Sequence, residues 1–356
     1  MLRPWKSLPL AWLWVVCGFA NSAPAASFFV VAQEVNTFDK AMNLALQGDM
    51  KAALPLFHGL SVGALPFNQA QAVHALLAWF EGSAKAPVTL DPWTAKVLGA
   101  YQTYWKKVML GQVPTEAGER DLFADLAPLA TGSINSAEAG VGALEPILQA
   151  KLQERGCHAL FGYTRPFREC MLWTSEQERS YAIELPEGHE DVRVVMLDGF
   201  LSLGWTGFAT GDYYHNGGWS RPDRLYCVAP SYDTNSESFR VSYLAHEGQH
   251  FSDHRRFPAL EGPELEYRAK LAELALADTT QGALLRAFSA NTSDNRNLPH
   301  AYANRLVLRN LAHVLAQHEP PAGAWWEAQK PSAIREAAVR LLKQDSAALS
   351  IPLGKP

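Results

Sequence analysis

The sequence SESFRVSYLAHEGQHFSDHRRF, residues 236–257, contains two histidines four positions apart, His246 and His250. Residues at this spacing lie on one face of an α-helix, about 6 Å apart along its axis. Two imidazoles placed in this way can bind a single metal ion, and Glu247 in the same turn can reach a water molecule beside it. This HExxH pattern therefore predicts a helix that carries a catalytic metal site.

The residues around the motif predict a mostly buried helix. Thr234 and Glu237 form a capping-box pattern, so the helix is expected to begin near Asn235. Residues 241–252 are apolar, small or neutral apart from the ionisable residues of the motif, which a buried helix must satisfy internally. Gly248 costs about 1 kcal/mol against alanine inside a helix, which indicates close packing against a neighbour.

The residues that follow the motif bear on whether it binds a metal and which residues take part. A chance match on a buried helix is the alternative interpretation, and Ser252 stands where such motifs usually have a hydrophobic residue. His254 continues the four-residue spacing, but it lies two turns, about 12 Å, from His246 and is too far to bind the same ion. His254 is therefore expected to be a solvated residue at the end of the helix.

A third ligand is required, because catalytic zinc sites commonly have three protein ligands and one open position. The following segment PELEYRAKLAELALAD, residues 263–278, offers the carboxylates of Glu264, Glu266 and Glu273. Glu266 is the preferred candidate, since the small Ala269 three positions later lets this helix approach the motif helix closely. Glu264 and Glu273 remain alternatives, and a solvated helix face is the alternative for all three.

The two segments together resemble the gluzincin branch of the zinc peptidases, the thermolysin-like clan. These enzymes carry HExxH on one helix and a glutamate ligand early in a following helix, commonly as Glu-x-x-Ala. The resemblance implies a Zn²⁺ cofactor, with His246, His250 and Glu266 as its ligands and Glu247 as the catalytic base. It covers residues 181–277 and carries no information about the substrate.

The chain departs from the clan at two points. Fifteen residues separate His250 from Glu266, fewer than is usual in the clan. The clan also has an aspartate four residues after the ligand glutamate, which orients the first histidine, and Lys270 occupies that position. Glu273 is the remaining candidate for this orienting role.

Gluzincins also use a downstream His, Tyr or Arg to stabilise the oxyanion of the transition state. In this chain the resemblance points to the segment SDNRNLPHAYANRL, residues 293–306, where His300 or Tyr302 would be that donor. Ordinary capping and core roles are the alternative for both residues. The resemblance further implies that a peptide substrate binds along the edge of the sheet, at residues 225–229 or the neighbouring strand.

The hydrophobic pattern predicts an α+β protein. A helical domain (27–150) is expected to precede a zincin-like domain (151–356) with a small mixed sheet and further helices. The first helices weakly resemble a tetratricopeptide unit, so this domain either binds a partner or simply packs on the rest of the chain. Helices are predicted at 38–46, 52–60, 69–80, 92–109, 263–277, 299–317 and 331–349, strands at 181–185, 192–200, 205–209 and 225–229, and a linker at 130–142.

The N-terminus predicts export from the cytoplasm. Residues 1–26 combine two basic residues, an apolar run and small residues, which is the pattern of a cleaved signal peptide. The mature protein would then be periplasmic or secreted, with no further membrane-spanning segment. Export favours one disulfide among the three remaining cysteines, and a Cys157–Cys170 bridge is preferred over one that uses Cys227.

These features predict an exported zinc-dependent hydrolase, a peptidase acting on peptide or protein substrates with Glu247 as general base. One alternative is a non-enzymatic helical binding protein with a structural or degenerate zinc site, in which residues 27–150 bind a protein partner. The other alternative is a zinc amidase that acts on cell-wall peptides. The net charge of −5, without a long basic block, gives no reason to expect nucleic acid as a partner.

Overall fold

The computed structural model describes four stretches of the chain, residues 25–82, 91–131, 140–316 and 324–350. The predicted signal peptide and linker lie mostly outside these stretches. Among the helices that the stretches contain, none combines the length and the apolar character needed to cross a membrane.

The described residues form two compact units. The N-terminal unit comprises residues 25–175 and 197–216, and the C-terminal unit comprises residues 176–196 and 217–350. Part of the sequence segment 151–356 therefore groups with the helical first half of the chain.

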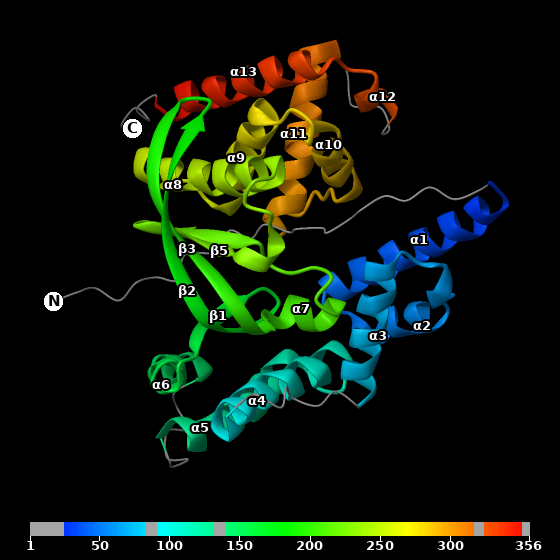
Figure 1. Cartoon of the computed structure of the whole chain (residues 1–356), viewed down its shortest axis with the longest axis vertical. Coiled ribbons are helices and arrows are strands. Elements are labelled where there is room, and N and C mark those ends of the chain that lie inside the picture. The colour runs from blue at the N-terminus through cyan, green and yellow to red at the C-terminus, as the bar shows by residue number, and fades with distance from the viewer. Residues whose placement is uncertain (1–24, 83–90, 132–139, 317–323, 351–356) are drawn as a thin grey trace, which may run out of the picture. The chain divides into compact units, whose positions relative to one another are not determined.

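The N-terminal unit is mainly helical, because its apolar residues recur at helical spacing. Its first two helices pack against each other, with the rings of Phe38 and Phe57 6.4 Å apart. Asp49 begins the second helix, since its carboxylate accepts a hydrogen bond from the backbone N–H of Ala52 at 3.0 Å. The helices are α1 (Ala25–Leu46), α2 (Met50–His58), η1 (Val62–Ala64), α3 (Phe67–Glu81), α4 (Pro92–Met109), α5 (Thr115–Thr131), α6 (Val141–Gln153) and α7 (Gly204–Thr210) (Figure 1).

Five strands form one sheet in the order β1-β2-β3-β5-β4, which makes the protein α+β, as predicted. β1 pairs antiparallel with β2, and β4 pairs antiparallel with β5 through a two-residue turn. β2 and β3 are long, and each continues from one unit into the other. The strands are β1 (His158–Thr164), β2 (Phe167–Leu185), β3 (Gly188–Leu203), β4 (Gly218–Arg221) and β5 (Arg224–Val228) (Figure 1).

The sheet is larger than the sequence predicted. The predicted strands 181–185 and 192–200 are confirmed as parts of β2 and β3, but residues 174–180 of β2 are exposed and show no alternating apolar pattern. The predicted strand 205–209 is wrong, because these residues form α7. The backbone N–H of Trp205 in its first turn donates to the buried carboxylate of Glu169 at 3.1 Å, a capping contact between residues distant in sequence.

The expected Cys157–Cys170 disulfide is not formed, and the cysteines of the described stretches are separate buried thiols. The register of β1 and β2 explains this, because Cys170 lies opposite Phe161, four residues along the chain from Cys157. That spacing corresponds to about 13 Å in an extended strand, whereas the Cα atoms of a disulfide lie within about 7 Å of each other. Burial raises the pKa of the Cys157 thiol to about 11, which makes it unreactive.

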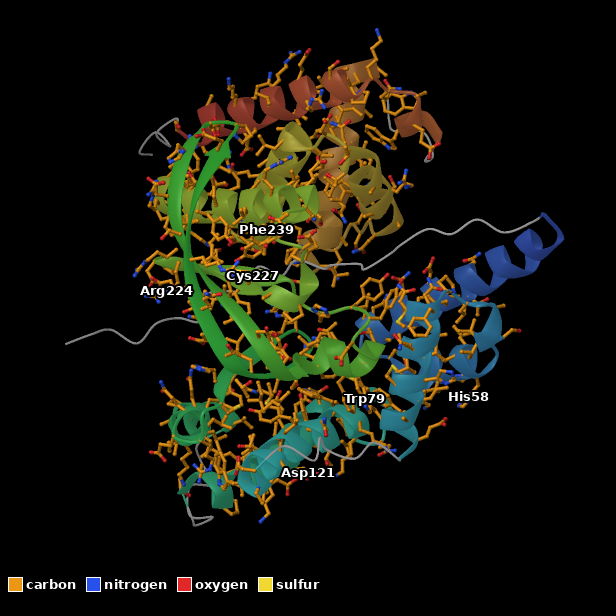
Figure 2. All side chains as sticks on the ribbon, in the orientation of Figure 1. His58, Trp79, Asp121, Arg224, Cys227 and Phe239 are labelled. Carbon is orange, nitrogen blue, oxygen red and sulfur yellow. The ribbon has the colours of Figure 1, made fainter. Side chains whose placement is uncertain are left out.

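The motif lies where the sheet and the helices of the C-terminal unit meet. One hydrophobic cluster packs the sheet against η3, through residues such as Cys227 and Phe239 (Figure 2). A second cluster packs α9 against the four helices that follow it. α8 contacts β4, β5 and α9. The helices of this unit are η2 (Ala229–Ser231), η3 (Phe239–Ala245), α8 (His246–Arg256), α9 (Gly262–Leu276), α10 (Gln281–Ala290), α11 (Pro299–Ala316), α12 (Ala324–Glu327) and α13 (Pro331–Leu349).

The close packing predicted from Gly248 is confirmed. A β-carbon added to Gly248 would lie 3.0 Å from Cδ1 of Ile183 and 3.7 Å from Cδ2 of Leu185, both on β2. All five residues of the motif are buried. His254, expected to be solvated, is half-buried near the end of α8.

The helix that carries the motif begins at Glu237, close to the predicted start, but its capping groups differ from the prediction. Oγ of Ser236 accepts a hydrogen bond from the backbone N–H of Phe239 at 3.1 Å. Glu237 does not close a capping box, because its carboxylate accepts hydrogen bonds from the backbone N–H of Thr279 at 2.9 Å and from the hydroxyl of Thr280 at 3.1 Å. Partial burial opposes ionisation, but these hydrogen bonds outweigh it and lower the pKa of Glu237 to about 2.

We predict that Glu237→Gln lowers the free energy of unfolding by about 1 kcal/mol at pH 7. This value is reduced to account for screening of the partly exposed carboxylate by solvent. The carboxyl pKa is about 2 in the folded protein against 4.5 in the unfolded chain. Its contribution is therefore complete above pH 4.5 and disappears as the pH falls toward 2. Denaturant unfolding at pH 7 and pH 3 measures the effect, with Glu336→Gln, an exposed carboxylate on α13, as control. Equal effects of the two changes would contradict the prediction.

Candidate metal centre

Two adjacent helices supply the residues of the centre. η3, a π-helix, continues without a break into α8, so His246 and His250 lie in the first turns of α8. Short π-helical segments often occur beside functional sites. Glu266 lies in the second turn of α9, which packs beside α8.

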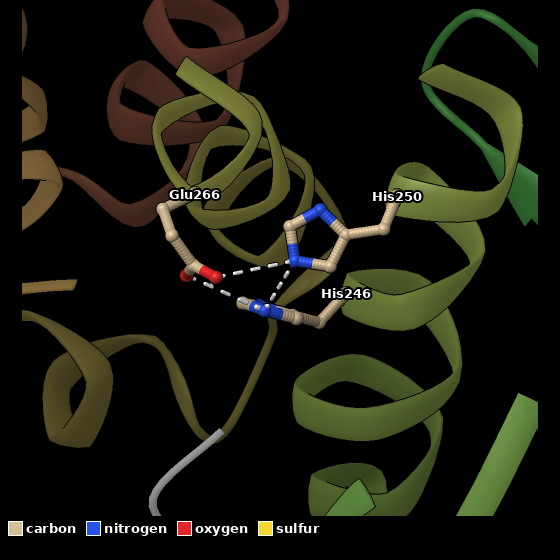
Figure 3. Close-up of side chains that lie close together, drawn as sticks. All are labelled: His246, His250 and Glu266. Carbon is tan, nitrogen blue, oxygen red and sulfur yellow. Dashed lines mark hydrogen bonds and ion pairs between the residues drawn. The ribbon is translucent and has the colours of Figure 1, made fainter. Parts of the chain in front are cut away.

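His246, His250 and Glu266 meet at one point in the interior of the C-terminal unit (Figure 3). Nε2 of His246 and Nε2 of His250 are 3.1 Å apart. The carboxylate oxygens of Glu266 lie 3.6 Å from Nε2 of His246 and 3.4 Å from Nε2 of His250. The structure thus brings together the three residues that the sequence singled out as ligands.

These distances suit a tetrahedral metal ion. Zn–N bonds of about 2.0–2.1 Å and Zn–O bonds of about 2.0–2.2 Å place neighbouring ligand atoms about 3.3–3.6 Å apart. The two Nε2 atoms are 3.1 Å apart, Oε1 of Glu266 lies 3.4 Å from His250 and Oε2 lies 3.6 Å from His246, so each histidine has one oxygen of this carboxylate near these values. Two nitrogens and one carboxylate also leave a fourth position for solvent or substrate. The donor set therefore fits a zinc ion.

Glu273 fixes the orientation of His246. Nδ1 of His246 donates a hydrogen bond to Oε1 of Glu273 at 2.7 Å, and both side chains are buried. This bond holds the proton on Nδ1 and leaves the lone pair of Nε2 directed at the metal position. Burial also lowers the pKa of His246, which favours the neutral ring that metals bind. Glu273 is therefore placed as the orienting carboxylate and not as the third ligand.

His300, in the first turn of α11, contacts the carboxylate of Glu266. Nδ1 of His300 lies 2.7 Å from Oε2 of Glu266, and the side chain of His300 is 16% exposed. Burial of Glu266 opposes ionisation, but His300 and His250 outweigh it and hold the pKa of Glu266 well below its usual range. Glu266 is thus an ionised carboxylate, the form that binds a metal.

Two other sequence candidates interact with Arg296 instead of with the centre. Glu264 accepts a hydrogen bond from Nη2 of Arg296 at 2.6 Å, so it is not placed as the third ligand. The guanidinium of Arg296 also lies over the ring of Tyr302, 5.2 Å from its centroid. The geometry gives no support for Tyr302 as an oxyanion donor.

Glu247 has the environment of a general base. Its side chain is fully buried, and neither carboxylate oxygen has a hydrogen bond of normal geometry within the described stretches of the chain; a weak contact with the Ser220 hydroxyl does not offset burial. Burial raises the pKa of Glu247 to about 8, with a contribution from Glu266 and Glu273 and with His250 opposing it. A buried carboxylate without hydrogen bonds costs stability, which points to a role other than packing.

The last strand of the sheet beside α8 is β4. β5 lies between β3 and β4, so the predicted edge at 225–229 is an interior strand and its neighbour β4 takes the edge position. The hydroxyl of Ser220 on β4 makes a weak contact that lowers the pKa of Glu247, and the pKa of Cys227 on β5 is raised by burial and, second to it, by Glu247. This edge is therefore adjacent to the candidate centre.

Buried charged residues of α9 outside the predicted ligand set were not expected from the sequence. α9 is buried along most of its length, although it carries Glu266, Arg268, Lys270 and Glu273. Arg268 donates from Nε to Oδ2 of Asp253 on α8 at 2.8 Å. Nζ of Lys270 lies 4.7 Å from the ring centre of Phe288 on α10. The signal was present in the sequence, because a helix with apolar residues on several faces must pair its charges internally.

Comparison of the chain with protein-family models, with curated proteins and with solved structures found no match. The resemblance to gluzincins therefore rests on the HExxH motif and the spacing of the following glutamates. It stays a prediction, and the geometry of the centre supplies the physical argument for function.

We predict that the protein binds one Zn²⁺ per chain and that Glu266→Ala weakens zinc binding by roughly 100-fold or more, because one of three ligands is lost. Glu273→Ala should weaken it by about 10–100-fold through loss of the orienting hydrogen bond. Glu264→Ala, two positions from Glu266 on the same helix, should leave the affinity unchanged. Metal analysis and chelator competition measure these effects, and wild-type affinity in Glu266→Ala would remove Glu266 from the centre.

Proposed function

We propose that this protein is a zinc-dependent hydrolase of the gluzincin type that acts on peptides or proteins. The proposal rests on the placement of Glu247, a buried carboxylate without a hydrogen bond of normal geometry among the described residues, in the same helical turns as His246 and His250. Such a group costs stability. Hydrolysis at a metal, however, needs a base at this place. Export to the periplasm or beyond is part of the proposal and derives from the N-terminal sequence.

Each residue of the centre has a defined part in this proposal. Zinc held by the two histidines and Glu266 would supply a Lewis acid for the substrate carbonyl and lower the pKa of water toward about 7. Glu247 accepts the proton of the attacking water and passes it to the leaving nitrogen. Burial raises the pKa of Glu247 in the metal-free site, and the positive charge of a zinc ion at the two histidines would lower it toward the ionised form that accepts a proton. Glu273 keeps Nε2 of His246 directed at the metal position.

His300 is better placed to hold Glu266 than to donate to an oxyanion. The contact between Nδ1 of His300 on α11 and Oε2 of Glu266 on α9 holds the ligand carboxylate by charge and by hydrogen bonding. Mutation of a residue that orients a metal ligand commonly weakens metal affinity by about 10–100-fold. We therefore assign His300 this positioning role in place of the donor role implied by the resemblance.

Full burial of the centre has a consequence for any substrate. Glu247 and the three ligands have at most 1% of their side-chain surface exposed, whereas His300 retains 16%. Hydrolysis therefore requires the centre to open to solvent and substrate.

A structural zinc site in a non-enzymatic binding protein is the second candidate, and the full burial of the ligands favours it. It does not account for Glu247, because a structural site would be more stable with a neutral residue at this position. A zinc amidase acting on cell-wall peptides would use the same residues, and a panel of peptide and cell-wall substrates separates it from a peptidase.

We predict that Glu247→Gln lowers turnover by about 10²–10⁴-fold without changing zinc content, because the base is lost while the ligands remain. The metal-free variant should also be more stable than metal-free wild type above pH 8. The folded pKa of about 8, against 4.5 in the unfolded chain, makes Glu247 destabilising as the pH rises between these values. Peptide hydrolysis with and without chelator, and unfolding at pH 5 and pH 9, measure both effects.

Two results would contradict the peptidase proposal. A Glu247→Gln protein that keeps its zinc and its turnover would show that Glu247 is not the base. Wild-type protein that binds zinc but cleaves neither peptides nor cell-wall amides would favour the structural site.

We predict that His300→Phe weakens zinc binding by about 10–100-fold while turnover per bound zinc is largely kept, because His300 acts on the ligand Glu266. Tyr302→Phe, two residues later on α11, is the control and should change neither quantity. Loss of turnover in fully zinc-loaded His300→Phe would instead assign His300 to the oxyanion.

A further inference from the structure

We propose that Arg268 is a positioning residue for the metal centre. Through Arg268, the C-terminal helix α13 and the β2–β3 turn fix the register of α9 on α8, the two helices that carry the proposed ligands. The inference rests on the proposed zinc centre and extends it to residues that contact neither the metal position nor Glu247.

The first part of the network joins α8 to α9 directly. Arg268 lies two residues after Glu266, and Asp253 lies three residues after His250. Nε of Arg268 donates to Oδ2 of Asp253 at 2.8 Å, and neither side chain has exposed surface. Nε2 of Gln249, inside the motif, donates to the other oxygen of Asp253 at 2.9 Å. The ion pair therefore lies within one helical turn of a ligand on each helix.

The second part joins α9 to distant elements. Nη1 of Arg268 donates to Oδ2 of Asp345 at 2.7 Å, and Nη2 donates to Oγ of Ser346 at 2.9 Å, both on α13. Nη2 also lies 3.3 Å from Oε2 of Glu187 in the β2–β3 turn, which accepts a hydrogen bond from Ser346 at 2.6 Å. One guanidinium group thus contacts α8, α13 and the turn.

A planar guanidinium with donors in fixed directions allows little variation in these positions. A shift of α9 along α8 by one residue would be about 1.5 Å and would break the buried ion pair. The same shift would carry Glu266 away from the histidines, and metal ligands tolerate errors of only about 0.2 Å. The network and the ligand set therefore require the same register of α9 on α8.

A role in stability alone explains the network less well. Buried ion pairs contribute little net stability relative to well-packed apolar residues of the same size. In some proteins such pairs instead fix one specific arrangement of the elements that they join. Here the elements joined are the two helices that carry the ligands, so the expected loss on mutation is in metal affinity.

The test uses the full chain with Asp345→Asn and Arg268→Lys. Arg268→Lys keeps the positive charge but loses the planar guanidinium group and its fixed donor directions. Asp278→Asn is the matched control, since Asp278 forms an exposed ion pair with Arg335 of α13 at 3.3 Å, outside the network. Zinc affinity is measured by chelator competition, coordination geometry by the visible spectrum of the Co²⁺ form, and folding by unfolding of the metal-free protein.

We expect zinc affinity to fall roughly tenfold in Asp345→Asn and by about 10–100-fold in Arg268→Lys, with altered Co²⁺ spectra and a folded metal-free state. The control should match wild type. Wild-type affinity and spectra in both network variants would overturn the inference while the zinc centre stands. Absence of zinc binding by wild type would overturn both. If either variant does not fold, Ser346→Ala decides by the same criteria, because it removes the hydroxyl that accepts from Arg268 and donates to Glu187.

Discussion

One constraint governs the interior of the C-terminal unit, namely that charged side chains removed from water must find partners on neighbouring elements. α9 meets it by placing Glu266 against two histidines, Glu273 against His246, and Arg268 against Asp253. All three sets of partners include residues of α8. Hydrophobic contacts alone tolerate sliding of one helix on another, because they are not directional. The paired charges do not tolerate such sliding, because their hydrogen bonds are directional, so they determine the register of α9 on α8.

Glu247 is the exception to this constraint, and for that reason it is informative. Glu266 and Glu273 on α9 are already paired with histidines, and the oxygens of Glu247 have no hydrogen bond of normal geometry within the described residues. A fold selected only for stability would not retain an ionisable group with a pKa raised to about 8 in this position. Strained or unsatisfied groups of this kind concentrate where chemistry occurs, because a reactive group must remain available to a substrate.

Local sequence patterns misled where a residue's partner lies far away along the chain. Residues 205–209 read as a strand, but they form α7 with a cap from Glu169 on β2. Glu237 read as half of a capping box, but its carboxylate binds the turn after α9. Cys157 and Cys170 read as a disulfide because they are close in sequence, and the register of β1 on β2 separates them. In each case the local pattern was compatible with two outcomes, and a distant contact selected one.

The sequence by itself determined the α+β class, most of the helices, and the presence of His246, Glu247 and His250 on one buried helix, because helical periodicity and motif spacing are local properties. It also narrowed the partner carboxylate to Glu264, Glu266 and Glu273 and favoured Glu266, without fixing which of them meets the histidines. Only the tertiary structure decided that Glu266 faces the two rings, that Glu273 lies behind one of them, and that Glu264 binds Arg296. The choice depends on the rotation and register of α9 against α8. These are set by contacts of Arg268 with residues up to 81 positions away, which no local pattern encodes.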